Sequence, residues 1–358
     1  MFKNPLKKLS LAAMCAAGLV SGVASANTIN QNVSWTITRS GATTTYRVVA
    51  YGDSIYAGYN GALWSVAKRS APHVQGEYLG KQWNANVQVV RRTKSGAVAS
   101  DIYNNKIVYE RSYMQATNTR VVTFEMCGND FLQARSAFND QTGTCNYGVL
   151  DTALSNCTLY TEKAMQAINT YATTAKLKLV SNIYYPGYNA DNVQTACKDS
   201  VTGATVNKRD KFIPYLAKAN WRTCNLAARY GFQCVDSFAQ WMGSDYDRNG
   251  DGVVDSEALR YQAGETEADY VTRITSTLKS TIVDSNTHFV SSTTSYDYLQ
   301  SDNTHGTYYG GTVSTGSSYS GAADFADSSV VDGKNTVWNR TGHERMGHGA
   351  AVFNPATP

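Results

Sequence analysis

Five short runs rich in β-branched residues alternate with long segments in which apolar residues recur at helical spacing. The first run ends at Gly52, and the others span residues 86–92, 119–126, 177–185 and 232–236. The helical segments span residues 150–176, 210–230 and 265–282. Strands separated by helices of this length need crossover connections, which favour parallel pairing. The sequence therefore predicts a three-layer α/β/α fold with a mostly parallel five-stranded sheet and helices on both faces.

The segments between these elements are less regular. Residues 27–43 are polar and predict a loose arm or an edge strand, and residues 98–105 are helix-like. Residues 306–331 are rich in Gly, Ser, Thr and Tyr without periodicity, which predicts a long surface loop. Residues 341–353 predict a terminal helix.

The first 26 residues have the pattern of a cleavable export signal. Three lysines precede a mostly apolar stretch at 9–23, and Ala24-Ser25-Ala26 is a small-x-small cleavage site. The apolar stretch is too short and too rich in Ala and Gly to span a bilayer well. We expect a mature chain of residues 27–358 forming one domain, exported to the periplasm or the medium, with no stable membrane anchor.

The charge balance argues against nucleic acid as a partner. The whole chain has 32 Lys and Arg and 28 Asp and Glu. Removing Lys3, Lys7 and Lys8 with the signal leaves 29 − 28 = +1. A nearly neutral chain has no electrostatic attraction to a phosphate backbone. A monomer is expected.

The cysteine pattern predicts disulfides. Six cysteines follow the signal, and none belongs to a Cys-x-x-Cys motif, which disfavours zinc or redox chemistry. An even number in an exported chain favours disulfides, but six cysteines allow 15 pairings. Cys145 with Cys157, closing a short loop, is the first candidate among pairings that the sequence leaves open.

Gly52-Asp53-Ser54 is the first candidate for a catalytic turn. Gly52 ends a strand, and the absence of a Cβ is expected to permit a sharp turn there. Ser54 would then lie at the carboxyl end of a parallel strand, the sheet edge where open α/β proteins bind ligands.

Three further sequence blocks complete a plausible reaction centre: Gly96, then Gly128-Asn129-Asp130, then Asp302 and His305. A serine needs a base, which His305 can supply while Asp302 orients the imidazole. The backbone N–H groups of Ser54 and Gly96 and the side-chain amide of Asn129 would stabilise an oxyanion.

Ordinary structural explanations exist for each block. Gly52-Asp53-Ser54 and Gly128-Asn129 are also typical of plain turns, and His305 is also compatible with a solvated loop. His343 is a second candidate for the base, although no Asp lies three residues before it.

The four blocks, in this order, resemble those of the SGNH (GDSL-type) hydrolase superfamily, secreted bacterial esterases and lipases among them. The resemblance spans nearly the whole mature chain. It implies a flavodoxin-like α/β/α fold with long inserted loops, and hydrolysis of carboxylic esters through an acyl-enzyme on Ser54. Cys145 and Cys157 follow Gly128-Asn129 as cysteines do in disulfide-bearing extracellular lipases of this superfamily. Gly306 departs from the proline often found after the family's histidine, and Gly342-His343 resembles the family's Gly-His helix start, displaced along the chain.

A segment at about 243–260 resembles an EF-hand or dockerin-type calcium loop. Oxygen ligands recur at the expected positions, and Gly252 allows the tight turn. The predicted ligands are Asp247, Asn249, Asp251, the carbonyl of Val253, Asp255 and Glu257. Ala258 occupies the position of the usual bidentate carboxylate, so an acidic turn before a helix is the alternative. Any calcium is expected to be structural, and no cofactor is expected for catalysis.

The sequence thus predicts a secreted serine ester hydrolase acting on lipid or acyl esters. The alternatives are a carbohydrate O-acetyl esterase and a non-catalytic secreted carbohydrate- or surface-binding protein on the same scaffold.

Overall fold

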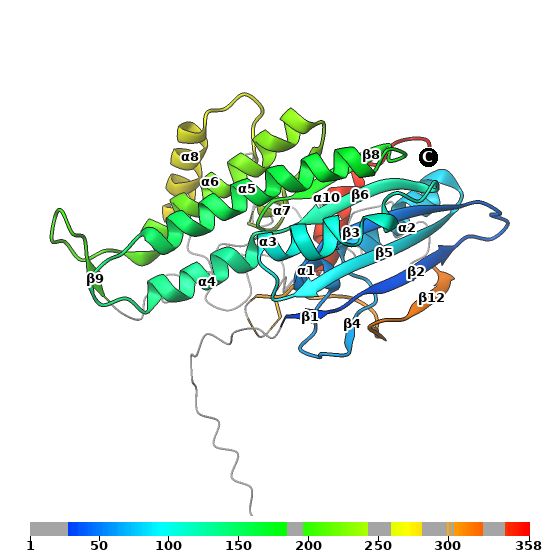
Figure 1. Ribbon diagram of the computed structural model, residues 1–358, viewed down its shortest axis with the longest axis horizontal. Helices are drawn as coiled ribbons and strands as arrows, with labels where there is room; N and C mark the ends of the chain where they lie inside the picture. Colours follow the sequence, from blue (N-terminus) through cyan, green and yellow to red (C-terminus); the bar gives the residue numbers. More distant parts are fainter. Residues whose placement is uncertain are drawn as a thin grey trace, which may run out of the picture.

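The computed structural model describes residues 28–184, 196–242, 259–280, 299–300, 302, 304–324 and 341–358. Its centre is an eight-stranded sheet with the strand order β10-β8-β6-β3-β5-β2-β12, and β1 pairs with β5 outside this path (Figure 1). The expected signal peptide, residues 1–26, lies outside the described residues.

The five strands predicted from the sequence pair with one another in parallel. They are β3 (Thr45–Gly52), β5 (Asn86–Ser95), β6 (Thr119–Glu125), β8 (Leu177–Ser181) and β10 (Gln233–Val235). Strands covered on both faces have near-continuous apolar runs, which is why these five were visible in the sequence. An α/β fold with a mostly parallel central sheet is confirmed.

The predicted number of five strands is too low. The sheet also contains β1 (Ile29–Asn30), β2 (Val33–Thr38) and β12 (Ser318–Ala322). β2 runs antiparallel to β5, and β12 runs parallel to β2. In β2 and β12 every second residue is more buried than its neighbours. Only one face of each strand is therefore packed, and the run of apolar residues that marks the central strands is missing. Residues 27–43 therefore contain strands and not a loose arm, but β2 is not an edge strand, because it pairs with β5 on one side and with β12 on the other.

The predicted surface loop at 306–331 is therefore wrong in part. Besides β12, it contains β11 (Thr312–Ser314), which pairs antiparallel with β4 (Ser65–Ala67). β11 has only three residues, and β12 contains two Ser, a Gly and an Ala, so neither segment has a strong strand pattern of its own. Their backbone hydrogen bonds to segments more than 240 residues earlier define them, and no local pattern encodes such pairing.

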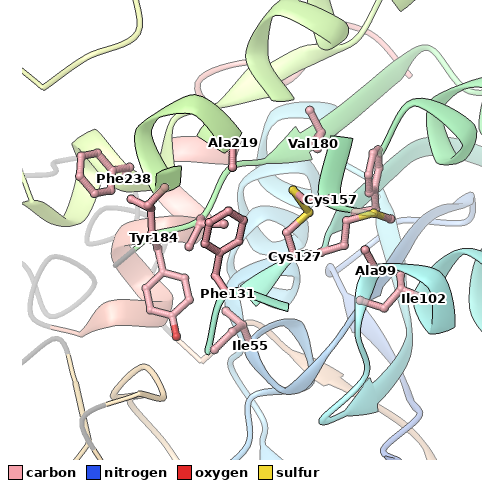
Figure 2. Close-up of a cluster of buried hydrophobic side chains, with 14 of the residues drawn as sticks. Ile55, Ala99, Ile102, Cys127, Phe131, Cys157, Val180, Tyr184, Ala219 and Phe238 are labelled. Carbon is pink, nitrogen blue, oxygen red and sulfur yellow. A yellow bond between two sulfur atoms is a disulfide. The ribbon is translucent and has the colours of Figure 1, made fainter. Parts of the chain in front are cut away.

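Apolar side chains from adjacent strand positions enter two clusters on opposite faces of the sheet. Val48 belongs to the cluster that includes Leu79 of α2 (Ala71–Trp83) and Ala350 of α10 (Gly342–Ala351). Val49 belongs to the larger cluster, part of which is drawn in Figure 2. α4 (Gly128–Asn139), α5 (Gly148–Tyr171) and α6 (Lys208–Tyr230) contribute to that larger cluster.

The remaining helices extend these layers. α8 (Glu267–Ser280) packs against α6, which packs against α5, and Figure 1 shows the three side by side. α1 (Ser54–Ala57) and α7 (Ser237–Met242) are short. The helix-like segment after β5 is α3 (Ala99–Asp101), continued by π-helical turns over Ile102–Val108. In the part of the chain that the structure describes, no helix has the length and hydropathy to cross a bilayer.

The six cysteines in the described part of the chain form disulfides, in the pairs Cys127–Cys157, Cys145–Cys197 and Cys224–Cys234. The first candidate pairing, Cys145 with Cys157, is wrong. Cys157 lies nine residues inside α5, about 14 Å along the helix from its start at 1.5 Å per residue. Its side chain meets Cys127 at the start of α4, while Cys145 precedes α5 and meets Cys197 of β9 (Cys197–Lys198).

This connectivity predicts the result of thiol mapping. Denatured, non-reduced mature protein should contain no alkylatable cysteine, and proteolysis should release the three linked peptides named above. The paired change Cys145→Ser/Cys197→Ser opens a link across 52 residues and should destabilise by about 4 kcal/mol. The control pair Cys224→Ser/Cys234→Ser opens a link across 10 residues and should lose about 3 kcal/mol. A Cys145–Cys157 peptide would contradict the fold.

Candidate active site

Ser54 is the first residue of α1 and follows the carboxyl end of β3 with one residue between. Asp53 caps the helix, because its Oδ1 accepts a hydrogen bond from the Ile55 N–H at 2.8 Å. Ser54 is buried, with 7% of its surface exposed. Gly52 lies outside the left-handed region, so a positive φ is not what requires glycine there. A Cβ there would lie 2.2 Å from Oε1 of Glu125, and close approach is what requires glycine.

The structure brings Ser54, His305 and Asp302 together. His305 Nε2 lies 2.9 Å from Ser54 Oγ, and His305 Nδ1 lies 2.6 Å from Asp302 Oδ2. The other Asp302 oxygen accepts hydrogen bonds from the backbone N–H groups of Thr304 and His305. Burial opposes ionisation of Asp302, but its bonds with His305 and Thr304 outweigh burial and lower its pKa to about 2. The carboxylate is therefore ionised at neutral pH and can orient the imidazole.

Two residues not predicted from the sequence hold the histidine segment. The ring of Tyr59 lies 4.5 Å from the His305 ring, centroid to centroid. The Gln300 side-chain amide donates to the carbonyls of Tyr59 and Gly306, both at 2.7 Å, and its backbone N–H donates to the His305 carbonyl. These contacts fix the segment to the loop that follows α1.

Gly306 fills a position with little room for a side chain. A Cβ there would lie 3.3 Å from Cη2 of Trp241 and 3.4 Å from Nε2 of His343. The first distance is tighter than ordinary van der Waals contact, and the second is at its lower limit. A proline ring would need these neighbours to shift, which gives a physical reason for glycine after His305.

Asn129 lies beside the nucleophile turn with its amide orientation fixed. Its Nδ2 donates to Asp53 Oδ2 at 2.9 Å and to the Ala97 carbonyl at 3.0 Å. Both amide protons are thus engaged. Donation to an oxyanion requires that one of these two bonds be exchanged for the bond to substrate.

Gly96 reaches the same sheet edge through strand register. Gly52 pairs with Thr93 across β3 and β5, so the chain reaches Gly96 three residues beyond that partner. Gly96 has φ +76°, in the region that favours glycine, and its neighbour Ala97 accepts the Asn129 hydrogen bond. The three expected oxyanion donors therefore converge on one edge of the sheet.

A left-handed residue sets the start of α4 and so the position of Asn129. Cys127, which caps this helix, has φ +81°, a conformation that costs a residue with a Cβ about 1–2 kcal/mol. Its disulfide to Cys157 and its carbonyl bond from the Phe131 N–H anchor this turn (Figure 2).

Three buried carboxyl groups surround the nucleophile turn: Asp53, Glu125 and Asp130. Burial raises the pKa of Asp130 to about 7, although the Ala99 N–H donates to it at 2.8 Å. Burial also raises the pKa of Asp53 and raises that of Glu125 well above its ordinary value. Such shifts are frequent where side chains act in chemistry.

His343, the second candidate for the base, makes no hydrogen bond with Ser54. It is completely buried, and neither ring nitrogen has a hydrogen-bond partner among the described residues. Burial, with the positive charge of Arg91 nearby, lowers its pKa to about 3. A neutral, enclosed imidazole behind Gly306 packs the site and has no route to a substrate proton.

A largely apolar pocket opens beside Ser54. Its walls come from α1, α4, α6 and the segments after β8 and before His305. The apolar lining residues are Ile55, Phe131, Leu132, Ile183, Phe212 and Leu216. Asn129, Tyr184 and Arg135 add polar groups, so a reacting group bound at Ser54 has an apolar space next to it.

The predicted calcium ligands, Asp247, Asn249, Asp251, Val253, Asp255 and Glu257, lie outside the described residues. Within the described part of the chain, His73, Glu77 and Asp324 place ligand atoms within 4.8 Å of one another. Arg69 Nη2 lies 2.6 Å from Glu77, and Lys68 Nζ lies 2.5 Å from Asp324. These cations already balance the carboxylates, so the cluster is an internal salt-bridge network.

Comparisons with known proteins give low similarity. No protein-family model matches the chain, and no curated protein is significantly similar. A lipase from a goat rumen metagenome is 17% identical, with a TM-score of 0.42, over 66% of this chain and 96% of that one. Phospholipase A1 from Streptomyces albidoflavus is also 17% identical, with a TM-score of 0.39, over 66% and 99%. An acetyl xylan esterase from Geobacillus stearothermophilus is 12% identical, with a TM-score of 0.35, over 64% and 91%. Values this low assign neither family nor activity.

Burial of neutral His343 predicts a specific pH dependence of stability. Unfolded protein gains a proton on this imidazole below its ordinary pKa of 6.5, whereas the folded protein keeps it neutral to about pH 3. The free energy of unfolding is therefore highest above pH 6.5 and decreases as the pH falls below that value. His343→Leu removes this penalty, and we expect the variant to gain up to about 3 kcal/mol relative to the wild type between pH 7 and pH 4. Urea unfolding at both pH values measures it, and a difference that does not change with pH contradicts it.

Proposed function

We propose that the protein is a serine ester hydrolase that forms an acyl-enzyme on Ser54. The observation that carries the proposal is the hydrogen-bonded series from Ser54 Oγ through His305 to Asp302, with separations of 2.9 and 2.6 Å. Distances in this range permit direct proton transfer between the side chains. The convergence of Ser54, Gly96 and Asn129 at one sheet edge supports the same chemistry.

The reaction follows from the roles of these atoms. Ser54 Oγ attacks the ester carbonyl carbon while His305 Nε2 takes the hydroxyl proton. The tetrahedral oxyanion accepts hydrogen bonds from N–H groups of Ser54, Gly96 and Asn129. His305 then gives its proton to the departing alcohol. A water molecule, activated by the same nitrogen, hydrolyses the acyl-enzyme and releases the acid.

The pocket favours an acyl group longer than acetyl. A single methyl group would leave most of the apolar surface from α4 and α6 in contact with water. Each buried methylene contributes about 0.8 kcal/mol, equivalent to about fourfold in kcat/KM if it is realised in the transition state. Lipid or acyl esters are therefore the proposed substrates, and acetylated carbohydrate is the alternative. Export is proposed from the sequence, and three disulfides are compatible with an oxidising compartment.

The nucleophile is tested by labelling. Ser54→Ala should abolish ester turnover, while thermal unfolding and circular dichroism stay close to those of the wild type. A serine-directed phosphonate should add once to the wild type, on the peptide that contains Ser54, and should not add to Ser54→Ala. Full turnover in a folded Ser54→Ala protein would falsify the mechanism.

The acyl preference is tested with p-nitrophenyl esters from acetate to palmitate. We expect kcat/KM to rise by about fourfold per methylene until the pocket is filled. Leu216→Trp, which places an indole in the pocket, should shift the optimum to shorter chains and leave acetate turnover nearly unchanged. Leu159→Trp, at an exposed position on α5 outside the pocket, is the matched control. A flat series with efficient release of acetate from acetylated xylan would support the carbohydrate esterase instead.

A further inference from the structure

Glu125 is a buried carboxyl group behind the nucleophile turn, and the mechanism above does not use it. It ends β6 and is 6% exposed. Its Oε1 accepts a hydrogen bond from the Asp53 N–H at 2.6 Å. It lies so close to Gly52 that a Cβ there would collide with it. Glu125 therefore contacts the backbone at Gly52 and Asp53, directly before the nucleophile Ser54.

A second contact joins the carboxyl groups of Glu125 and Asp53, which are within hydrogen-bonding reach of each other. The Asp53 oxygens already accept from the Ile55 N–H and from the Asn129 amide. These donors favour the ionised form of Asp53. Two adjacent buried carboxylates would repel each other, so one proton stays on the pair, and it belongs on Glu125.

We propose that Glu125 is a positioning residue that works in its protonated form. Through its bonds to the backbone and the carboxylate of Asp53, it holds the nucleophile turn and the Asn129 amide in place. Glu125 does not line the pocket beside Ser54, so its effect on the reaction passes through Asp53.

The surroundings of Glu125 are consistent with a neutral acid. Burial is the largest cause of its raised pKa, and the charge of Asp53 adds to it. From α1, the backbone N–H of Tyr56 lies within hydrogen-bonding reach of it, whereas the Tyr56 hydroxyl bonds to Thr123 and Ser181. Asp130, from α4, and His305 interact electrostatically with Asp53 and so affect the pair of Asp53 and Glu125. Asn182 and Met346, which line a small cavity with Glu125, add no charge.

Ionisation of Glu125 would therefore place a second negative charge against Asp53 and remove the acid–carboxylate hydrogen bond. The nucleophile turn and Asn129 would lose their alignment, which lowers kcat. KM should change little, because Glu125 does not contact the pocket for the acyl group. Misplacement of reacting groups by about 1 Å can cost about 100-fold in rate.

Thermal unfolding from pH 5 to pH 9 tests the protonation state without any substrate. Because the folded pKa is raised, the wild type loses the contribution of Glu125 as the pH rises above the ordinary glutamate range. Glu125→Gln keeps both hydrogen bonds in uncharged form, so its Tm should exceed that of the wild type by a margin that grows with pH. Glu125→Ala should be less stable throughout, with a pH profile parallel to that of Glu125→Gln. A wild-type profile parallel to both variants overturns the proposal.

The kinetic test rests on the proposed function. In wild-type protein kcat should fall at alkaline pH, and in Glu125→Gln this fall should be absent or displaced. Glu125→Ala should lose about 10- to 100-fold in kcat at neutral pH with KM nearly unchanged. An unchanged kcat in Glu125→Ala, or the same alkaline fall in Glu125→Gln, overturns the positioning role. If the wild type hydrolyses no ester, the proposed function fails, and the unfolding profiles still decide the state of Glu125.

Discussion

The hydrogen bonds of Asp53 join the parts of the candidate site that come from separate strands. Its backbone N–H donates to Glu125 at the end of β6, and its carboxylate accepts from Asn129 at the start of α4. Asn129 in turn bonds to Ala97 beyond β5. Displacement of Asp53 would therefore disturb the nucleophile, the amide and the Gly96 turn together. Because the group is buried, each unsatisfied bond would cost about 1–3 kcal/mol.

The part of the site that follows the parallel strands could be predicted from the sequence. Val-rich runs identified β3, β5 and β6, and the residues directly after each run are Asp53-Ser54, Gly96 and Gly128-Asn129. Parallel strands end at the same edge of a sheet, so topology alone brings these residues together. No knowledge of side-chain packing was needed. The three long helices α5, α6 and α8 were visible for a similar reason, since their apolar periodicity is local.

The remaining features depend on contacts between distant segments. Among the described residues, no strand of the main sheet leads into His305. Gln300 holds its segment by a hydrogen bond to Tyr59, 241 residues earlier, and the Tyr59 ring contacts the imidazole. Glu125 occupied an unremarkable position within a strand-like run, and its role became apparent when Gly52 was found against it. The pairing of Cys127 with Cys157 likewise follows from the direction of two helices. Composition and spacing carry no information on such geometry.

Near Ser54 and near His305, a glycine packs against a buried ionisable side chain. Gly52 adjoins the carboxyl group of Glu125, and Gly306 adjoins the imidazole of His343. A Cβ at Gly52 would displace the Glu125 carboxyl group, and a Cβ at Gly306 would crowd Trp241 beside His343. Burial raises the pKa of Glu125 and lowers that of His343, so both groups are neutral between the two pKa values. At acid pH His343 would become positively charged, and at alkaline pH Glu125 would become negatively charged. Each of these charges would be buried and poorly solvated. The packing that aligns Ser54 with His305 therefore requires an intermediate pH.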